Sequence, residues 1–318
     1  MNSNRVSLTV IFTTYNEEHN IEKALQSVYN WADEIIVVDS FSTDSTPTIV
    51  AQYPRVTFVQ RDYYSPAHQK NWAIPTACHE WILLMDADER ATPEMRSEIE
   101  EIVYNSETQR QSGLRGEIEY QKDYSLATSS IGHTSNDIDK NNLTALNAYH
   151  QSQTFDAYWI GFTHYFMGKK VKYSGWQNDK TIRLIKRDVC RYNSNRVHEE
   201  IVTEGLKIGF LKNKFEHYTF KDLNHFIQKQ ERYALWSAED KDPTTGKITY
   251  FHLTLKPFAR FFKHFILKKG FLDGRVGFII SAIAAWSVFL RYTFMLENRG
   301  RLSNKNNRIT YKIIEKVK

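Results

Sequence analysis

Residues 81–88 read Trp-Ile-Leu-Leu-Met-Asp-Ala-Asp, an apolar run that ends in two aspartates one residue apart. A hydrophobic run of this length, bounded by polar residues, is typical of a buried strand in a parallel sheet. Residues i and i+2 of an extended chain point the same way, so Asp86 and Asp88 should converge past the strand's carboxyl end, where open α/β sheets bind ligands. Two carboxylates there suit Mg²⁺ or Mn²⁺ carrying a diphosphate, although a bare Asp-x-Asp is as often an acidic loop.

The chain around this run alternates strands and helices. The apolar runs predict four strands, at Leu8–Phe12, Glu34–Val38, Val56–Val59 and Trp81–Met85. Between these strands, apolar residues at helical spacing or helix-capping signals indicate helices. Thr92-Pro93 indicates the start of a further helix after the last strand. This alternation predicts an α/β fold with a Rossmann-like parallel sheet and helices on both faces.

Three of these strands end in polar clusters, namely Thr14–Glu17, Asp39 and Asp86–Asp88. In a doubly wound sheet they would lie side by side along one edge. No Gly-x-Gly-x-x-Gly or Gly-Lys-Ser/Thr loop follows any of them, so a metal ion rather than a backbone cradle should neutralise a phosphate. Asp39 taken alone could cap a turn or contact a nucleoside with about equal probability.

The rest of the chain divides by composition. We expect an α/β half at 1–104, a polar insertion at 105–155, a second apolar half at 156–250 and a basic amphipathic tail at 251–318. The insertion is rich in Ser, Asn, Gln and Thr with few periodic hydrophobics. Only Cys78 and Cys190 are present, so no disulfide framework is indicated and a reducing compartment fits.

The tail is basic and aromatic within a chain of net charge +5. Residues 256–270 mix both kinds at helical spacing, which predicts an interfacial amphipathic helix, and interleaved apolar residues favour a membrane over nucleic acid. Residues 276–290 carry no charge but fall short of the ~20 residues that a spanning helix needs. Extension of this run to Leu296 would bury Arg291, and insertion of an arginine at midbilayer costs about 2.5–3.5 kcal/mol of free energy. We therefore expect in-plane or re-entrant insertion, with a helical hairpin buried against the rest of the protein as the alternative.

Four motifs carry a resemblance to a known family. They are Val10-Ile11-Phe12-Thr13-Thr14-Tyr15-Asn16-Glu17-Glu18-His19-Asn20-Ile21, Ile36-Val37-Val38-Asp39-Ser40-Phe41-Ser42-Thr43-Asp44, Gln69-Lys70-Asn71-Trp72-Ala73 and Leu84-Met85-Asp86-Ala87-Asp88-Glu89. In order and spacing over residues 7–95 the chain resembles the inverting family 2 glycosyltransferases. Within that family it is most similar to the bacterial lipopolysaccharide-core β-glucosyltransferase branch. The fold implied is the glycosyltransferase-A type, with residues 1–104 as its nucleotide-sugar-binding half and residues 156–250 as its acceptor-binding half.

The resemblance also implies roles for individual residues. Those implied to bind the nucleotide sugar are Thr14, Tyr15, Glu17, Asp39, Lys70, Asn71, Asp86 and Trp176. Asp39 would hold the base or ribose, and Asp88 and His217 would ligate Mg²⁺ or Mn²⁺. Glu199, in the run 196–200, would be the base that deprotonates the acceptor hydroxyl, although that run could simply be a polar strand end.

The activity implied is transfer of a hexose, first glucose from a UDP-linked donor, to a lipid-linked glycan such as lipopolysaccharide core. The resemblance implies peripheral or monotopic contact with the cytoplasmic face of the inner membrane and no nucleic-acid partner. One alternative is a nucleotidyltransferase, but residues 13–20 lack the glycine that its phosphate loop would need. Another is a non-catalytic membrane scaffold that retains the fold, which would not bind UDP with Mn²⁺.

Overall fold

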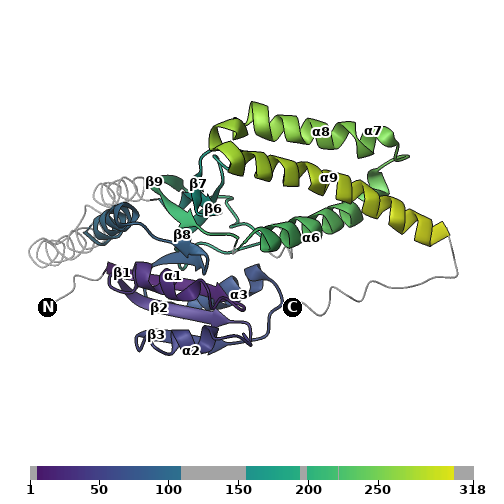
Figure 1. Ribbon diagram of the computed structural model, residues 1–318. Helices are drawn as coiled ribbons and strands as arrows, with labels where there is room; N and C mark the ends of the chain where they lie inside the picture. The colour runs from purple at the N-terminus through teal and green to yellow at the C-terminus, as the bar shows by residue number, and fades with distance from the viewer. Residues whose placement is uncertain (1–5, 109–154, 194–198, 221, 304–318) are drawn as a thin grey trace, which may run out of the picture. The chain divides into compact units, whose positions relative to one another are not determined.

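The computed structural model describes residues 6–108, 155–193, 199–220 and 222–303 (Figure 1). The chain forms two compact units. The first unit comprises Met1–Phe162 and Asp179–His217, and the second comprises Thr163–Asn178 and Tyr218–Lys318. The four-part division expected from composition stays a prediction, and most of the expected insertion lies outside the described residues.

The first unit is built on a sheet whose first four strands are parallel, in the order β3-β2-β1-β4. These strands are β1 (Val6–Thr14), β2 (Ala32–Asp39), β3 (Val56–Gln60) and β4 (Trp81–Asp86). All four were predicted from their apolar runs. Residues 81–85 of β4 are buried throughout, as expected for a strand covered on both faces.

The sheet continues with strands from later in the chain, in the order β8-β6-β9-β5. They are β8 (Lys180–Lys186), β6 (Ala157–Phe166), β9 (Ile208–His217) and β5 (Glu89–Arg90). β8 runs antiparallel to β4, β6 to β8, and β5 to β9. The predicted α/β fold class with a Rossmann-like parallel half is therefore confirmed, within a sheet that is mixed as a whole.

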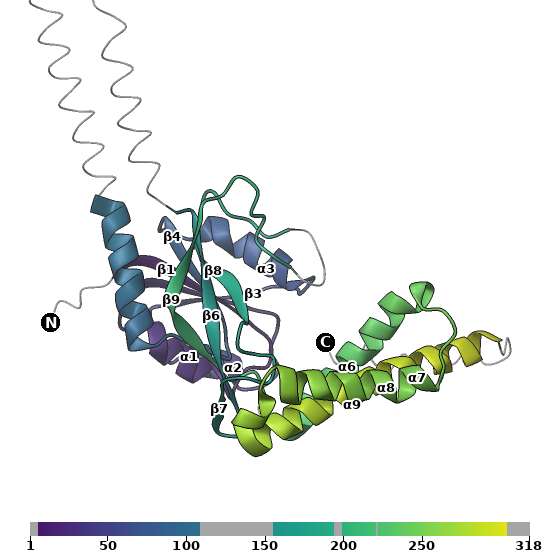
Figure 2. The ribbon, with the colours of Figure 1, turned by 90° about the horizontal axis from the view of Figure 1, so that it is seen from above.

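Helices cover both faces of this sheet. They are α1 (Ile21–Val28), α2 (Thr46–Val50), α3 (Pro66–Ala73), the short 3₁₀ helix η1 (Ile74–Thr76) and a helix at 93–108. Because side chains alternate along a strand, Leu83 packs in one cluster with Leu25 and Ile99, whereas Leu84 packs in the other with Ala73. The helix at 93–108 and α3 lie on opposite sides of the sheet (Figure 2).

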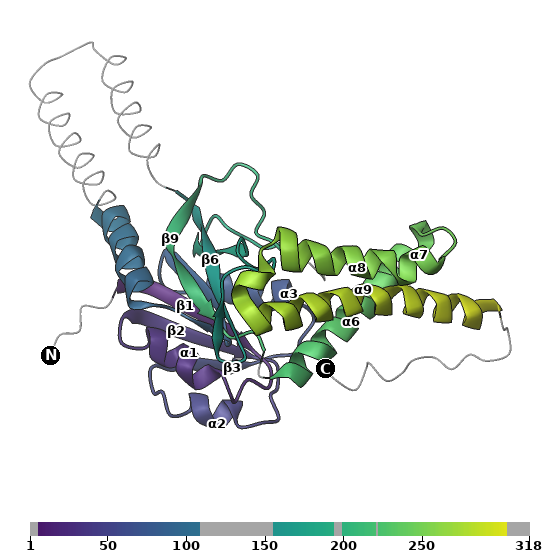
Figure 3. The same ribbon diagram turned by 45° about the horizontal axis from the view of Figure 1, so that its top comes forward.

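The second unit is mainly helical (Figure 3). Its elements are β7 (Lys169–Val171), α6 (Leu223–Lys241), the 3₁₀ helix η2 (Asp242–Thr244), α7 (Tyr250–Leu253), α8 (Leu255–Phe262), the π-helical turn η3 (Lys263–Leu267), the 3₁₀ helix η4 (Gly270–Asp273) and α9 (Gly274–Ser303). α9 packs against both α6 and α8. The Asp273 carboxylate fixes the start of α9 by accepting hydrogen bonds from the backbone of Lys172 and Tyr173 and from the Ser174 hydroxyl.

The tail is helical, as its spacing predicts. α8 and η3 cover most of residues 256–270, and the uncharged run at 276–290 lies within the 30-residue helix α9. Among the described residues, one helix, Gly270–Gly300, is long and apolar enough to cross a membrane. Core helices of soluble proteins can be equally long and apolar, so these two properties alone are weak evidence for a membrane span.

Candidate active site

The polar strand ends lie side by side at one edge of the first unit, as the sequence predicts. Thr14 at the end of β1 pairs in register with Asp39 at the end of β2, and Thr13 pairs with Asp86 at the end of β4. This arrangement follows from parallel pairing of three strands of similar length. The edge therefore gathers side chains from three separate loops.

Asp39 is fully buried, and its carboxylate accepts four hydrogen bonds. Oδ1 accepts from the hydroxyls of Thr14 (2.9 Å) and Ser42 (2.5 Å), and Oδ2 accepts from the Ser42 backbone (2.8 Å) and Gln60 Nε2 (3.0 Å). These bonds use the roughly four lone-pair positions of a carboxylate. A base or ribose contact by Asp39 stays a prediction and requires that one of these donors be displaced.

The loops after β1 and β2 are held together by backbone-to-side-chain bonds. Glu17 N donates to Thr46 Oγ1, and Asn16 N donates to Ser42 Oγ, each at 2.8 Å. The Glu17 carboxylate accepts from Asn20 Nδ2. Tyr15 remains 40% exposed on this rim. The structure thus brings the predicted nucleotide-binding residues of the first loop together with Asp39.

Two cations meet two carboxylates just past β4. Lys70 of α3 is buried, and its Nζ lies 3.5 Å from Asp86 Oδ1. Arg183 of β8 is also buried, and its Nη2 donates to Asp86 Oδ2 and to Glu89 Oε1, the latter at 2.7 Å. Glu89 Oε2 accepts the Asp86 backbone N–H at 3.0 Å. The buried charges are therefore paired, as buried charges must be.

The pKa shifts in this cluster follow from the pairing. Burial alone would raise the pKa of the Asp86 carboxyl, but the charges of Arg183 and Lys70 outweigh it and hold the pKa well below its ordinary value. Burial alone would lower the pKa of Lys70, but Asp86 keeps that pKa above its ordinary value. Burial raises the pKa of the fully buried Glu89 carboxyl to about 7 against the attraction of Arg183. Asp86 and Lys70 are thus both charged at neutral pH.

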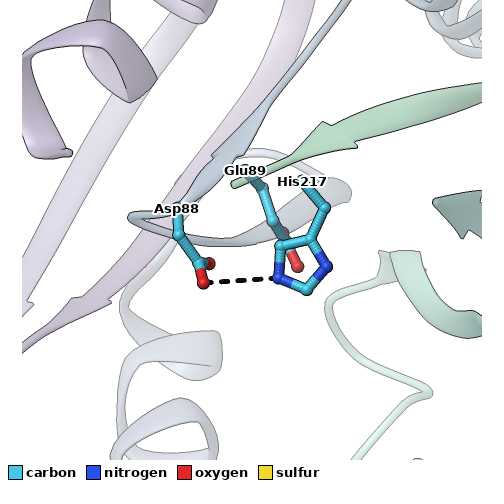
Figure 4. Close-up of side chains that lie close together, drawn as sticks. All are labelled: Asp88, Glu89 and His217. Carbon is cyan, nitrogen blue, oxygen red and sulfur yellow. Dashed lines mark ion pairs between the residues drawn. The ribbon is translucent and has the colours of Figure 1, made fainter. Parts of the chain in front are cut away.

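Asp88 and His217 meet beside this cluster (Figure 4). The antiparallel pairing of β5 with β9 sets Glu89 opposite His217, and His217 Nε2 lies 3.3 Å from Asp88 Oδ2. One possible ligand atom from each of these three residues lies within 4.8 Å of the others. The predicted pair of Asp88 and His217 is therefore brought together, and Glu89 joins it.

The residues fit a divalent cation. Burial alone would lower the pKa of His217, but the hydrogen bond and charge of Asp88 outweigh it and raise the pKa, so the pocket favours positive charge. Carboxylate oxygens with one imidazole nitrogen suit Mn²⁺, and Mg²⁺ less well. Both Glu89 oxygens already accept hydrogen bonds, from Arg183 and from the Asp86 backbone. Asp88 and His217 are thus the better-placed ligands.

Glu199 lies at the other side of Lys70, with Oε1 3.9 Å from Nζ. It is held by a short antiparallel bridge between Tyr192 and Ile201. Asn71 of α3 clamps the same segment, since its side chain accepts from the Tyr192 backbone N–H (2.8 Å) and donates to the Tyr192 carbonyl (2.9 Å). The predicted base thus lies near Asp86, whereas Asn71 is engaged with backbone. Residues 196–198 of the predicted motif lie outside the described residues.

Trp176 belongs to the second unit. Its ring packs among His164, Phe166, Phe220 and Phe226, with ring-centroid distances between 5.3 and 6.3 Å. Trp176 is thus partly buried against the hydrophobic cluster that contains Phe166 and Phe226. Its predicted contact with the nucleotide sugar stays a prediction.

The comparisons with known proteins show the family of this chain. The model of the family described as "Glycosyl transferase family 2" matches residues 9–191, more than half of the chain. The chain belongs to this family. The matched residues include the ends of β1, β2 and β4, whereas Glu199 and His217 lie beyond the match. The family resemblance in the sequence is therefore confirmed, and the protein is a glycosyltransferase.

Two glycosyltransferases are similar to this protein over nearly its whole length. An uncharacterised glycosyltransferase of Rickettsia conorii is 26% identical and covers 94% of this chain and 92% of its own. The lipopolysaccharide core biosynthesis glycosyltransferase LpsC of Rhizobium meliloti is 23% identical and covers 91% and 94%. A crystal structure of glucosyl-3-phosphoglycerate synthase from Mycobacterium tuberculosis, in complex with Mn²⁺, UDP and glucosyl-3-phosphoglycerate, is 21% identical over 26% of this chain and 34% of that chain. Its TM-score of 0.25 supports no inference.

Sequence reasoning missed Arg183 and Glu89 as members of this family 2 site. Glu89 follows Asp88 directly, but only the β5–β9 pairing shows that it faces His217. Arg183 sits in a strand that reads as an ordinary apolar run with basic ends. Its signal, a charged residue between Ile182 and Leu184, could have been noticed as a buried cation in need of a partner.

Proposed function

We propose that this glycosyltransferase moves a hexose, with glucose as the first candidate, from a UDP-linked donor to a lipid-linked glycan such as lipopolysaccharide core. The transfer would invert the anomeric carbon by direct displacement. One observation carries the proposal. Asp88 pairs with His217 beside Asp86, and Lys70 contacts both Asp86 and Glu199. A donor diphosphate and an attacking hydroxyl both need a place in such a site, and these residues offer one for each.

Asp88 and His217 would hold Mg²⁺ or Mn²⁺, and such an ion stabilises the charge that develops on a leaving diphosphate. Asp86, kept ionised by Arg183 and Lys70, would accept a hydrogen bond from the ribose or from water. Thr14, Tyr15, Glu17 and Asp39 line the neighbouring loops where a nucleoside would lie. The donor half of the proposal rests on this one edge of the sheet.

Glu199 would act as the general base. A carboxylate within hydrogen-bond reach of the acceptor hydroxyl removes its proton as the hydroxyl attacks the sugar. The Tyr192–Ile201 bridge and the Asn71 clamp hold the segment that carries Glu199. Lys70 lies between Asp86 and Glu199 and contributes an ammonium group to both.

A lipid-linked acceptor is supported by the relative named for lipopolysaccharide core biosynthesis and by the surface of the second unit. Large apolar side chains of α8, η3 and η4 are exposed, namely Leu255, Phe258, Phe262, Ile266, Leu267, Phe271 and Leu272. Lys256, Arg260, Lys263, Lys268 and Lys269 interleave with them. Basic residues beside an apolar stripe fit the boundary of an anionic lipid leaflet. We propose monotopic contact with the cytoplasmic face of the inner membrane.

The test is a transfer assay with a panel of UDP- and GDP-sugars and extracted lipid glycans, read by mass spectrometry, together with UDP binding in the presence of Mn²⁺. We expect Mn²⁺-dependent UDP binding and addition of one hexose. Asp88→Asn should lower transfer by about 1,000-fold or more, because the ion's stabilisation of the leaving group amounts to several kcal/mol.

The matched control is Asp33→Asn. Asp33 also pairs with a histidine, His79, at 3.2 Å, but outside the site, so this variant should transfer normally. A wild-type protein that binds no UDP with Mn²⁺ would support the scaffold alternative. In a separate assay with a nucleoside triphosphate and a sugar phosphate, release of pyrophosphate with formation of a nucleotide sugar would support a nucleotidyltransferase instead.

A further inference from the structure

Arg183 occupies an irregular position in β8. Tyr158 of β6 pairs with Leu184, but the next residue, Trp159, pairs with Ile182, so Arg183 is an extra residue on β8. Packing agrees with a β-bulge there, because Ile182 and Leu184 fall in different core clusters although regular alternation would put them in the same one. Bulges commonly redirect a side chain next to an active site.

The redirected guanidinium closes a ring of hydrogen bonds around the turn at 86–89. Arg183 Nη2 donates to the carboxylates of Asp86 and Glu89, and Glu89 in turn accepts the Asp86 backbone N–H. These three bonds fix the backbone and the side chain of Asp86 together. None of the three involves the Asp88 carboxylate, which is the one that faces His217.

The burial of these three side chains shows why a cation that reaches both carboxylates matters here. The Arg183 side chain is 7% exposed and that of Glu89 is 0% exposed, whereas that of Asp86 is 38% exposed. Neutralising the buried Glu89 would need only one cation, yet Arg183 also reaches out to the partly exposed Asp86. Both carboxylates accept from the same nitrogen, Arg183 Nη2, so one buried cationic group bridges the inner and the outer carboxylate.

We propose that Arg183 is a positioning residue, which orients Asp86 and the Asp86–Glu89 turn so that Asp88 and His217 can bind a divalent ion with a nucleoside diphosphate. The inference rests on the proposed function. Partners that orient metal-binding groups in this way typically contribute about 10- to 100-fold to metal affinity or activity.

The test compares Glu89→Gln with the double variant Arg183→Met/Glu89→Gln. The double variant removes both buried charges at once, which avoids an unpaired carboxylate, and it should melt close to the single variant. We measure the dissociation constants for Mn²⁺ alone and for UDP with Mn²⁺, in addition to transfer. The expected result is that the double variant binds UDP with Mn²⁺ about 10- to 100-fold more weakly than Glu89→Gln.

Equal binding by the two variants would overturn the inference, since Arg183 would then serve only to neutralise Glu89. Arg183→Lys/Glu89→Gln should recover part of the affinity by restoring the charge beside Asp86. Arg187→Met, which changes a neighbouring arginine that pairs with exposed Asp188, should bind like wild type. A wild-type protein that binds neither Mn²⁺ nor UDP would instead overturn the proposed function, and this inference with it.

Discussion

At the scale of single residues, the site is governed by how each carboxylate is paired. Asp86 is held by two cations, Glu89 is fully buried against one of them, and Asp88 faces an imidazole. Glu199 Oε1 lies 3.9 Å from Lys70 Nζ. Carboxylates of one site can thus take different tasks because their surroundings differ. The role of Glu199 as the general base stays a prediction.

Glu199→Gln should retain UDP binding in the presence of Mn²⁺ and lower kcat by about 100- to 10,000-fold, the range for loss of a general base. An amide keeps the shape of the side chain but cannot accept the proton. Steady-state kinetics with separate titration of UDP binding checks this split between kcat and affinity.

Glu200→Gln is the comparison, since Glu200 is the exposed neighbour of Glu199. Normal transfer by Glu199→Gln together with loss of transfer in Glu200→Gln would move the base to Glu200. Loss of UDP binding in Glu199→Gln would show that Glu199 serves the donor rather than the acceptor.

At the scale of elements, α3 connects the donor and base sides of the site. Its N-terminus is capped by Ser65, whose hydroxyl accepts the His68 backbone N–H, with Pro66 in the first turn. The consecutive residues Lys70 and Asn71 then reach different partners, Asp86 and the backbone of Tyr192. The helix thereby couples the β4 turn to the segment that carries Glu199.

Asn71→Ala should lower kcat by about 10- to 100-fold, because small displacements of a reacting group have effects of that order. It removes two hydrogen bonds to Tyr192, so the free energy of unfolding should fall by about 1–3 kcal/mol. UDP affinity should change little, since Lys70 and Asp86 keep their contacts. Thermal unfolding and steady-state kinetics measure these quantities.

The matched control is Asn213→Ala, which also removes two side-chain hydrogen bonds, to the Glu94 carbonyl and the Glu98 carboxylate, away from the site. It should lose comparable stability and retain transfer. If both variants lost kcat equally, the effect of Asn71 would be one of global stability, and the coupling through α3 would be wrong.

At the scale of the whole molecule, the chain joins two units of different surface. The first is an α/β unit with a polar edge, and the second is a helical unit that exposes large apolar and basic side chains on α8, η3 and η4. A soluble protein rarely exposes many aromatic and aliphatic side chains together without a partner. The basic neighbours of these side chains favour an anionic lipid surface as that partner.

Phe258→Ser/Phe262→Ser should weaken binding to phosphatidylglycerol vesicles by at least about tenfold, since each phenylalanine gains up to about 1.5–3 kcal/mol when buried. Both side chains are exposed on α8. Vesicle co-sedimentation at low and high salt measures this loss of binding. The wild-type protein should bind vesicles of phosphatidylcholine alone more weakly than anionic vesicles.

Tyr104→Ser is the control, because Tyr104 is an exposed aromatic residue on the helix of the first unit at 93–108. It should leave vesicle binding unchanged. Unchanged binding by the α8 variant, or equal binding to neutral and anionic vesicles, would contradict the proposed membrane surface.

The sequence by itself determined the parallel half of the sheet and the polar edge, because continuous apolar runs specify buried strands and parallel strands align their ends. It also placed Asp86 and Asp88 at that edge. The association of Asp88 with His217 came only from the family resemblance, not from any local pattern. Only the tertiary structure decided that Glu89 faces His217 and that Arg183 reaches Asp86. Those contacts depend on antiparallel register and a bulge between distant strands, which packing across the sheet selects and local sequence does not encode.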